Sequence, residues 1–208
     1  MFEKYRPFLL GVSHSKEMLW DVFQEIDKVK PKSIGIEESK WSVENWRQIG
    51  LNPHHAGFWR VLIRECRARG IEITYLTPDR VAQQNIREQL RLKKLGITAQ
   101  KVLENPQGHT EGKELLRHMR DKTTDVVEMT ARKRRPQMLV LGLFHSAILR
   151  KNLGIPKARF SVHVVPSPRA IREMGVRVPR RKLEARKKQL IEGMLFHVKG
   201  YRRAARKR

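Results

Sequence analysis

Two histidines follow apolar segments of the chain with the same local spacing. The segment PFLLGVSHS places His14 three residues after Gly11, and QMLVLGLFHSAI places His145 three residues after Gly142. Each apolar run has the length of a buried strand, and a helical pattern follows each histidine. Glycine suits a tight strand-to-helix turn because it tolerates unusual backbone angles and lets a ligand approach closely. We therefore expect two loops at one edge of a sheet to present two imidazoles to a single site.

Two carboxylates end another apolar segment, SIGIEE, whose last residues are Glu37 and Glu38. Successive side chains of a strand point to opposite faces, so only one of the two can face a given site, and Glu37 is preferred. Two imidazoles and one carboxylate commonly hold a divalent metal that lowers the pKa of bound water and polarises a carbonyl. The residues thus predict a divalent metal ion held by His14, His145 and Glu37. Carboxylates at a strand end also serve as helix caps or ion-pair partners.

The elements that must position these residues alternate between strand and helix. A strand at 7–12, a helix at 18–29 and a strand at 33–38 form a βαβ opening, which favours a parallel sheet. Ligands of such open sheets gather at the carboxyl ends of the strands. The sequence predicts an α/β domain with a mostly parallel central sheet flanked by helices. Further strands are expected at 71–76, 137–144 and, at a sheet edge, 160–165, and further helices at 41–49, 58–69, 77–95, 111–133 and from His145 to about 154.

The order of the motifs resembles that of the TraB/PrgY/Tiki family, within the wider group of erythromycin-esterase-like and ChaN-like proteins. The residues that carry the resemblance are Gly11-Val-Ser-His14, Glu37-Glu38, Arg120-Asp121 on a long helical segment, and Gly142-Leu-Phe-His145. The resemblance spans roughly residues 7 to 150. It implies an α/β fold with a central sheet and a site built from the two histidines and a glutamate.

The family includes metal-dependent peptidases, esterases, proteins that bind haem or iron, and pheromone-shutdown factors. The resemblance implies that the two histidines are metal ligands or acid/base groups, with Glu37 or Glu38 beside them. It also implies that Arg120 stabilises an anion or orients a carboxylate, and that Asp121 supports it. The chain differs from the family at Leu143 and Phe144, which are bulky where relatives often carry small residues.

The charge of the chain is strongly positive and unevenly distributed. The formal net charge is +24, and residues 169–208 hold fifteen Lys and Arg against three Glu, or +12. We expect one α/β domain over residues 1–168 and a basic, helical C-terminal tail over 169–208. Such a tail suits RNA, DNA or a ribonucleoprotein, because Lys and Arg neutralise phosphates. A solvated tail or a basic helix on an anionic membrane remains the alternative.

Composition excludes several other classes of protein. No run reaches the roughly 18 apolar residues of a membrane span, and the short charged N-terminus does not resemble a signal peptide. The single cysteine, Cys66, excludes an internal disulfide and a thiolate zinc site. We therefore expect a cytoplasmic protein.

The remaining histidines and the tryptophans have simpler interpretations. His54, His55, His109 and His118 are expected at the surface, His163 is expected to be structural, and Cys66 is expected in the core. Trp41, Trp46 and Trp59 could stack nucleic-acid bases, but the sheet also needs large residues to cover it, and core packing is preferred.

Two functional hypotheses follow from the sequence. The first is a metal-dependent hydrolase that cleaves a peptide or an ester. The second is a non-catalytic protein that binds nucleic acid or ribonucleoprotein through its basic tail. A hydrolase directed to an anionic substrate combines the two, and the sequence leaves the substrate and the oligomeric state open.

Overall fold

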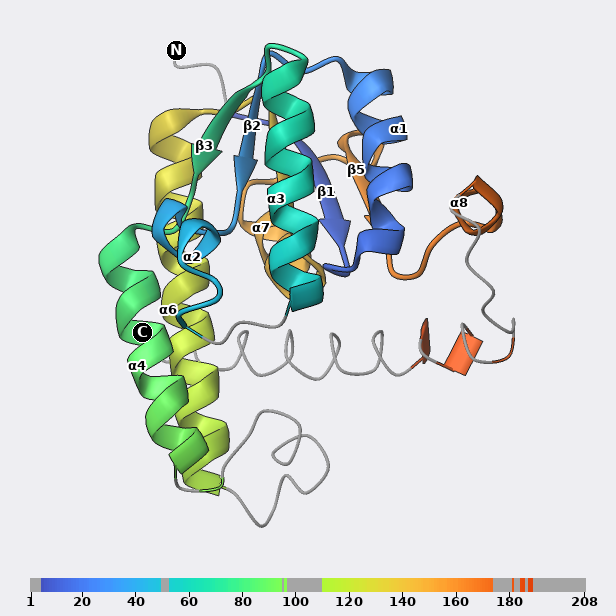
Figure 1. Cartoon of the computed structure of the whole chain (residues 1–208). Coiled ribbons are helices and arrows are strands. Elements are labelled where there is room, and N and C mark those ends of the chain that lie inside the picture. The colour runs from blue at the N-terminus through green and yellow to red at the C-terminus, as the bar shows by residue number, and fades with distance from the viewer. Residues whose placement is uncertain are drawn as a thin grey trace.

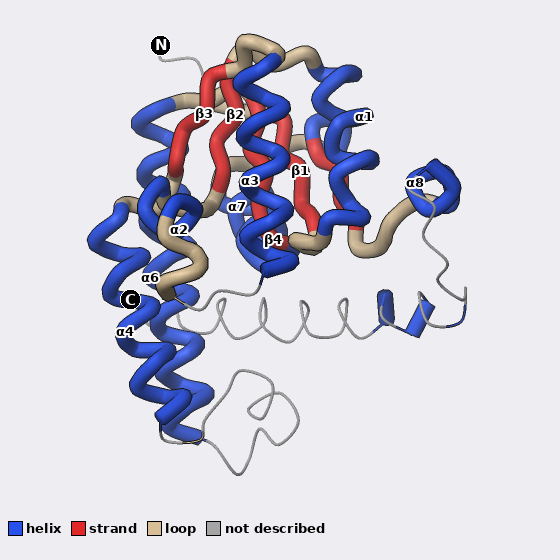
Figure 2. The backbone as a smooth tube through the Cα atoms, viewed as in Figure 1, coloured by secondary structure: helices blue, strands red, loops and turns tan. Residues whose placement is uncertain are grey.

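A single five-stranded parallel sheet forms the centre of the molecule (Figures 1 and 2). The computed structural model describes residues 5–49, 53–94, 96, 110–173, 181, 184–185 and 187–188. All strand pairs are parallel, which confirms the α/β class and the parallel sheet. The strands are β1 (Phe8–Val12), β2 (Ser33–Ile36), β3 (Glu72–Tyr75), β4 (Met138–Gly142) and β5 (Phe160–His163), in the order β3-β2-β4-β1-β5.

Strand β4 lies between β1 and β2 and pairs with both. Val140 is level with Leu10 of β1 on one side and with Ile36 of β2 on the other. The fourth strand along the chain is therefore inserted between the first two. This order brings the carboxyl ends of β1, β2 and β4 side by side at one edge of the sheet, where ligands bind in folds of this kind.

Helices cover both faces of the sheet, and each face has its own apolar core. The side chains of α1 and α3 pack with Leu10, Ile34 and Val140 on one face. Leu9, Leu139 and Leu141 point to the opposite face, because side chains alternate along a strand, and there they pack against α6 and α7. The helices are η1 (Lys16–Met18), α1 (Leu19–Val29), α2 (Lys40–Glu44), α3 (Pro53–Ala68), α4 (Asp79–Lys94), α6 (Thr110–Arg134), α7 (Leu143–Asn152), η2 (Lys157–Arg159) and α8 (Pro168–Glu173).

The elements follow the sequence pattern closely, with differences at their ends. Helix α3 begins at Pro53, five residues before the expected start, and proline is well suited to a first helical turn because its missing N–H needs no partner there. Strand β2 ends at Ile36, so Glu37 and Glu38 lie in the turn that leads to α2. Strand β5 lies at an edge of the sheet, as predicted.

The described fold continues past Pro168 into α8. The backbone N–H of Ser167 donates to Oδ2 of the buried Asp21 at 2.9 Å, and Ala170 is buried. The first residues of the basic segment therefore pack against the domain. Most of 174–208, which carries the bulk of the basic tail, lies outside the described residues. Within the described part of the chain, no helix is both long enough and apolar enough to cross a membrane.

Candidate active site

The carboxylate of Glu37 lies between the two imidazoles that the sequence singled out. Its Oε1 is 3.2 Å from Nε2 of His14, and its Oε2 is 2.8 Å from Nδ1 of His145. The three side chains are only 10–15% exposed. The structure thus brings the two histidines and Glu37 together at the carboxyl edge of the sheet.

The arrangement follows from the register of the strands. Val12 at the end of β1 is level with Gly142 at the end of β4, so both histidines come within three residues of the same edge. Glu37 is the first residue after β2, and the backbone N–H of Gly142 donates to its Oε2 at 2.5 Å. The hydroxyl of Thr77, which follows β3, donates to the carbonyl of Glu37. Neighbouring strands on both sides therefore fix Glu37.

The two glycines of the paired motif are required for different structural reasons. Neither of them adopts a positive φ. A Cβ on Gly142 would lie 3.0 Å from Oε1 of Glu37 and 3.0 Å from a ring carbon of His14. The missing side chain of Gly142 therefore leaves room for Glu37 and His14. A Cβ on Gly11 would lie 2.3 Å from Oγ of Ser146, so that glycine admits helix α7. Close approach, rather than an unusual backbone angle, explains both positions.

Aromatic residues hold the two histidine rings. The ring of His14 lies 4.7 Å from Trp59 and 5.5 Å from Phe58, both buried on α3. The ring of His145 meets that of Phe144 edge-on at 5.5 Å. Nε2 of His145 is buried and has no hydrogen-bond partner among the described residues. The described residues therefore leave the hydrogen-bonding capacity of this enclosed nitrogen unused.

The electrostatics of the site favour an ionised Glu37. Burial on its own would raise the pKa of this carboxyl group, but the charges of His14 and His145 and the hydrogen bonds from His145 and Gly142 lower it to about 2. Because the carboxylate only accepts hydrogen bonds, Nδ1 of His145 must carry the proton. In the neutral form of the ring, Nε2 is then the nitrogen that can accept a proton.

Arg120 and Asp121 lie on α6, and Arg120 reaches the site through an aromatic contact. The guanidinium carbon of Arg120 lies 4.3 Å from the ring centre of Phe144, next to His145. Burial lowers the pKa of Arg120 to about 10, while the negative charge of Asp121 raises it, so the guanidinium stays positive at neutral pH. The bulky side chain of Phe144 lies between Arg120 and His145 and contacts both.

Glu38, the alternative carboxylate, takes part in the start of α2. Its Oε2 accepts a hydrogen bond of 2.7 Å from the hydroxyl of Ser42, and Ser39 caps the same helix. Its neighbour Glu37 is thus the carboxylate that contacts both His14 and His145.

Comparisons of the chain with protein-family models, with curated proteins and with solved structures find no match. The resemblance of its motifs to the TraB/PrgY/Tiki family consequently rests on the residues themselves. What those residues can do is determined by the geometry around Glu37.

The donor atoms of the site are of the kinds that bind a divalent metal ion, and one of their spacings is close to that of a ligand shell. Ligand atoms on a tetrahedral shell with bonds of about 2.0–2.2 Å are roughly 3.4 Å apart, close to the 3.2 Å between His14 and Glu37. In this structure, however, Oε2 of Glu37 is hydrogen-bonded to Gly142 and contacts His145. Within the described ranges, no group of three or more His, Cys, Asp or Glu side chains is arranged to hold a metal ion. The metal site therefore remains a prediction.

The remaining candidates lie apart from this constellation. His118 is exposed and Cys66 is fully buried, as predicted. Nε2 of His163 lies 3.6 Å from Glu25, an ion pair between β5 and α1 that suits its expected structural role. The side chains of His54 and His55, together with His109, lie outside the described residues.

Sequence reasoning missed several residues that build the site. Phe58 and Trp59 pack on His14, and Thr77 holds the backbone of Glu37. Trp59 could be assigned to the core from its size, but no local pattern pointed to the histidine. Thr77 could have been found only from its position directly after a strand.

Proposed function

We propose that this protein is a hydrolase that cleaves an amide or ester bond at the site formed by His14, Glu37 and His145. The observation that carries the proposal is the buried, ionised carboxylate of Glu37 between the two imidazoles. A carboxylate that fixes the tautomer of a histidine is a recurring way to make the other ring nitrogen a general base. The resemblance to the TraB/PrgY/Tiki family supports the same reaction class.

The proposed reaction uses His145 as the general base. Glu37 accepts the Nδ1 proton of His145 in a hydrogen bond, so Nε2 removes a proton from a water molecule as the water oxygen attacks the carbonyl carbon of the substrate. The protonated imidazole, stabilised by the charge of Glu37, then gives that proton to the departing oxygen or nitrogen as the bond to the carbonyl carbon breaks. Arg120 is proposed to stabilise the oxyanion that develops in between, with Asp121 supporting its charge.

As the alternative form of the same proposal, a divalent metal ion held by His14, His145 and Glu37 replaces the general base. When bound, such an ion would supply a water molecule of lowered pKa and polarise the substrate carbonyl. His14 would then contribute Nε2, which already lies beside the carboxylate. His145 and Glu37 would exchange their mutual contact for contacts with the ion.

The test uses the purified full chain, with p-nitrophenyl acetate and a quenched fluorescent peptide library as substrates. Each substrate is tried after treatment with a chelator and after addition of Zn²⁺, Mn²⁺ or Co²⁺. We expect hydrolysis that falls at least about 100-fold in His145→Ala and in Glu37→Gln, the scale on which general acid–base groups contribute. Elemental analysis of the purified protein measures the metal separately.

The control variant is His163→Ala, which removes a histidine of the same sheet edge that pairs with Glu25 of α1 rather than with Glu37. It should keep full activity. If His14→Ala, His145→Ala and Glu37→Gln all hydrolyse the substrates as fast as His163→Ala does, the proposed site is wrong. If activity is the same with and without metal, the metal part of the proposal is wrong and the base mechanism stands.

A second candidate function is favoured by the charge of the C-terminal segment. We propose contact with RNA, DNA or a ribonucleoprotein through residues 169–208, whose net charge is +12, in a cytoplasmic protein. Because α8 packs on the domain, deletion should begin after Glu173. Removing 174–208 should abolish a salt-sensitive mobility shift of RNA or duplex DNA. An unchanged shift would exclude this role for the tail.

A further inference from the structure

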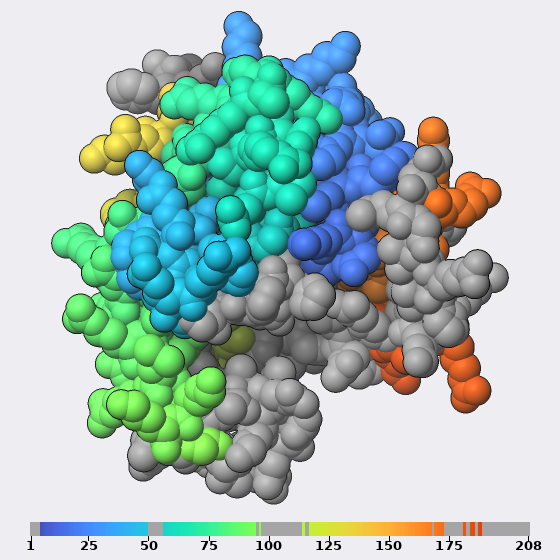
Figure 3. Space-filling view, viewed as in Figure 1, coloured from blue at the N-terminus to red at the C-terminus, as the bar shows by residue number. Residues whose placement is uncertain are grey.

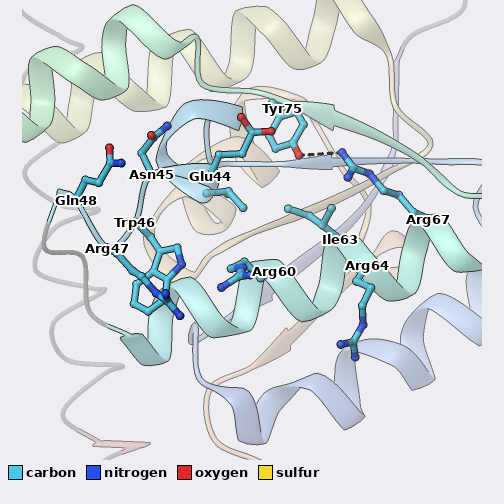
Figure 4. A pocket seen from close by; sticks show the side chains of 11 residues that line it. Glu44, Asn45, Trp46, Arg47, Gln48, Arg60, Ile63, Arg64, Arg67 and Tyr75 are labelled. Carbon is cyan, nitrogen blue, oxygen red and sulfur yellow. Dashed lines mark hydrogen bonds between the residues drawn. The ribbon is translucent and has the colours of Figure 1, made fainter.

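An arginine-rich pocket lies beside the outer side of α3, between that helix, β3 and the segment that follows α2. Its volume is about 620 Å³. Four of the residues around it are arginines, Arg47, Arg60, Arg64 and Arg67, and Glu44 is the one acid among the eleven that line it. Figure 3 shows α2 and α3 side by side on the surface of the molecule, and Figure 4 shows the pocket between them. The pocket is therefore suited to an anion.

Three of these arginines come from one face of α3. Arg60, Arg64 and Arg67 are spaced four and three residues apart, which places them along the same side of a helix. The axial distance from Arg60 to Arg67 is about 10 Å at the usual helical rise. All three side chains belong to exposed residues. The row can thus follow an extended anionic ligand or hold a compact one at two points.

The arginines differ in how far their charges are already neutralised. Arg64 contacts Glu65 at 2.8 Å, and Arg67 donates to the phenol oxygen of Tyr75 at 3.3 Å (Figure 4). Neither Arg47 nor Arg60 forms an ion pair with any residue that the structure describes. Two to three positive charges therefore remain for a ligand.

An aromatic ring completes the pocket. The guanidinium carbons of Arg47 and Arg60 lie 5.3 Å and 5.9 Å from the ring centre of Trp46, which is half-buried. In Figure 4 the indole of Trp46 and the guanidinium of Arg60 lie near each other at one end of the pocket. Aromatic rings and guanidinium planes both stack on nucleobases, while arginines bind phosphates through paired hydrogen bonds.

We propose that this pocket binds a nucleoside phosphate, either free or as a unit of single-stranded RNA. The base stacks on Trp46, and Arg60 and Arg67 bind the phosphate. The side-chain amides of Asn45 and Gln48, which also line the pocket, can donate to and accept from the edge of the base. A plain phosphate would use the arginines but gain nothing from the indole, so the ring is what selects a nucleotide.

The pocket is separate from the histidine site, although both use α3. Trp59 is buried and packs against His14, while the next residue, Arg60, points outward to the pocket. The proposal also involves no residue of the basic tail. It stands or falls independently of the proposed hydrolase.

The first experiment titrates the full chain with AMP and follows tryptophan fluorescence, with inorganic phosphate as a second probe. We expect saturable quenching by AMP, and at least about fivefold weaker AMP binding in Trp46→Ala, since loss of one stacked base has about this effect. The double variant Arg60→Ala/Arg67→Ala should weaken AMP binding at least about tenfold, because hydrogen bonds to charged groups are lost. Isothermal titration calorimetry measures AMP binding to the variant that lacks Trp46.

The matched control is Arg87→Ala/Lys93→Ala, which removes the same charge from exposed residues of α4. It should change AMP binding less than twofold. Equal weakening in the pocket variant and in the control would overturn the proposal, because binding would then reflect net charge alone. So would AMP binding that Trp46→Ala leaves unchanged, or the absence of saturable binding by any probe. Circular dichroism of each variant checks that the fold is intact.

A fluorescein-labelled oligoadenylate of ten nucleotides distinguishes the two sources of the nucleotide. If single-stranded RNA is the ligand, the oligonucleotide binds at least about tenfold tighter than AMP, and the pocket variant lowers the slope of log K against log salt by about 1 relative to the control. If a free nucleotide is the ligand, AMP binding depends on the pocket while oligonucleotide binding is the same in the pocket variant and the control. Either result supports a nucleoside-phosphate pocket and identifies which form it takes.

Discussion

Nδ1 of His145 lies 2.8 Å from Oε2 of Glu37, the same carboxylate oxygen that accepts the backbone N–H of Gly142. The backbone of Gly142, at the end of β4, therefore fixes the carboxylate. The side chain of His145, three residues later in α7, contacts the same oxygen. The second oxygen of Glu37 lies 3.2 Å from Nε2 of His14, which follows β1. A single anionic group thus links three segments that are far apart in the sequence, and its ionisation should affect both stability and chemistry.

The lowered pKa of Glu37 predicts a loss of stability in acid. The pKa is about 2 in the folded chain against 4.5 for an unperturbed group, so its contribution is complete above about pH 4.5 and is lost as the pH falls toward 2. The shift corresponds to about 3 kcal/mol. Urea unfolding in the presence of a chelator should show wild type losing about this much more free energy of unfolding than Glu37→Gln between pH 5 and pH 2.

The matched variant for this measurement is Glu38→Gln, whose carboxylate accepts from Ser42 instead. Glu38→Gln should lose as much free energy of unfolding between pH 5 and pH 2 as wild type does. Parallel curves for wild type and Glu37→Gln over this pH range would show that the contacts of Glu37 do not stabilise the fold.

The close packing at Gly142 predicts that a single methyl group disturbs the site. In Gly142→Ala the new Cβ would lie 3.0 Å from both Glu37 and His14. We expect hydrolysis to fall at least about tenfold, because misplacement of catalytic groups by about 1 Å is costly. The stability of the fold should fall by about 1–3 kcal/mol. Activity assays and urea unfolding measure the two effects. Unchanged activity would mean that the carboxylate can move without consequence.

The close packing of Gly11 against Ser146 predicts that a substitution at Ser146 restores stability lost by a substitution at Gly11. In Gly11→Ala the Cβ would lie 2.3 Å from Oγ of Ser146, a contact that must shift α7. Removing that oxygen in Ser146→Ala should therefore restore part of the lost stability. In a double-mutant cycle monitored by urea unfolding, we expect the two substitutions to couple favourably by at least about 1 kcal/mol. Additive effects would indicate that β1, rather than α7, adjusts to the methyl group.

The fold class and the strand-end position of the three central residues could be predicted because they depend on local patterns. Apolar runs of five or so residues, each followed by a helical period, indicate a parallel sheet whatever the strand order. His14, Glu37 and His145 all follow such runs, so a common edge was predictable. That they touch depends on β4 lying between β1 and β2, which no local pattern specifies.

The supporting contacts could not be predicted because they cross between distant segments. The stacking of Arg120 on Phe144 joins α6 to α7, and the position of Trp59 against His14 joins α3 to the segment after β1. The relation of Arg60 to Trp46 likewise depends on the segment after α2 lying beside α3. Strand alternation predicted that only one of Glu37 and Glu38 faces the site, but it did not select Glu37, and the strand itself ends at Ile36.

The buried thiol of Cys66 is predicted to be unreactive until the chain unfolds. Burial raises its pKa to about 12, an effect that the nearby Arg69 only partly offsets. At pH 8 the thiolate fraction is then about three orders of magnitude below that of an exposed cysteine. Reaction with a disulfide reagent such as dithionitrobenzoate should therefore follow the opening of the α3 core. Fast reaction of the native protein, at the rate seen in urea, would contradict this packing.

The contact between Arg120 and Phe144 predicts that this arginine acts on the reaction rather than on the fold. Its guanidinium lies 4.3 Å from the Phe144 ring, and in the proposed mechanism it stabilises the oxyanion. Arg120→Met should lower kcat by about 100-fold, the usual effect of losing one such charge or donor, while KM changes little. Arg150 offers a matched control, because it stacks on Phe160 at 4.6 Å from the same helix that carries His145. Arg150→Met should leave kcat unchanged. An equal loss of kcat in both variants would show that Arg120 acts only through packing.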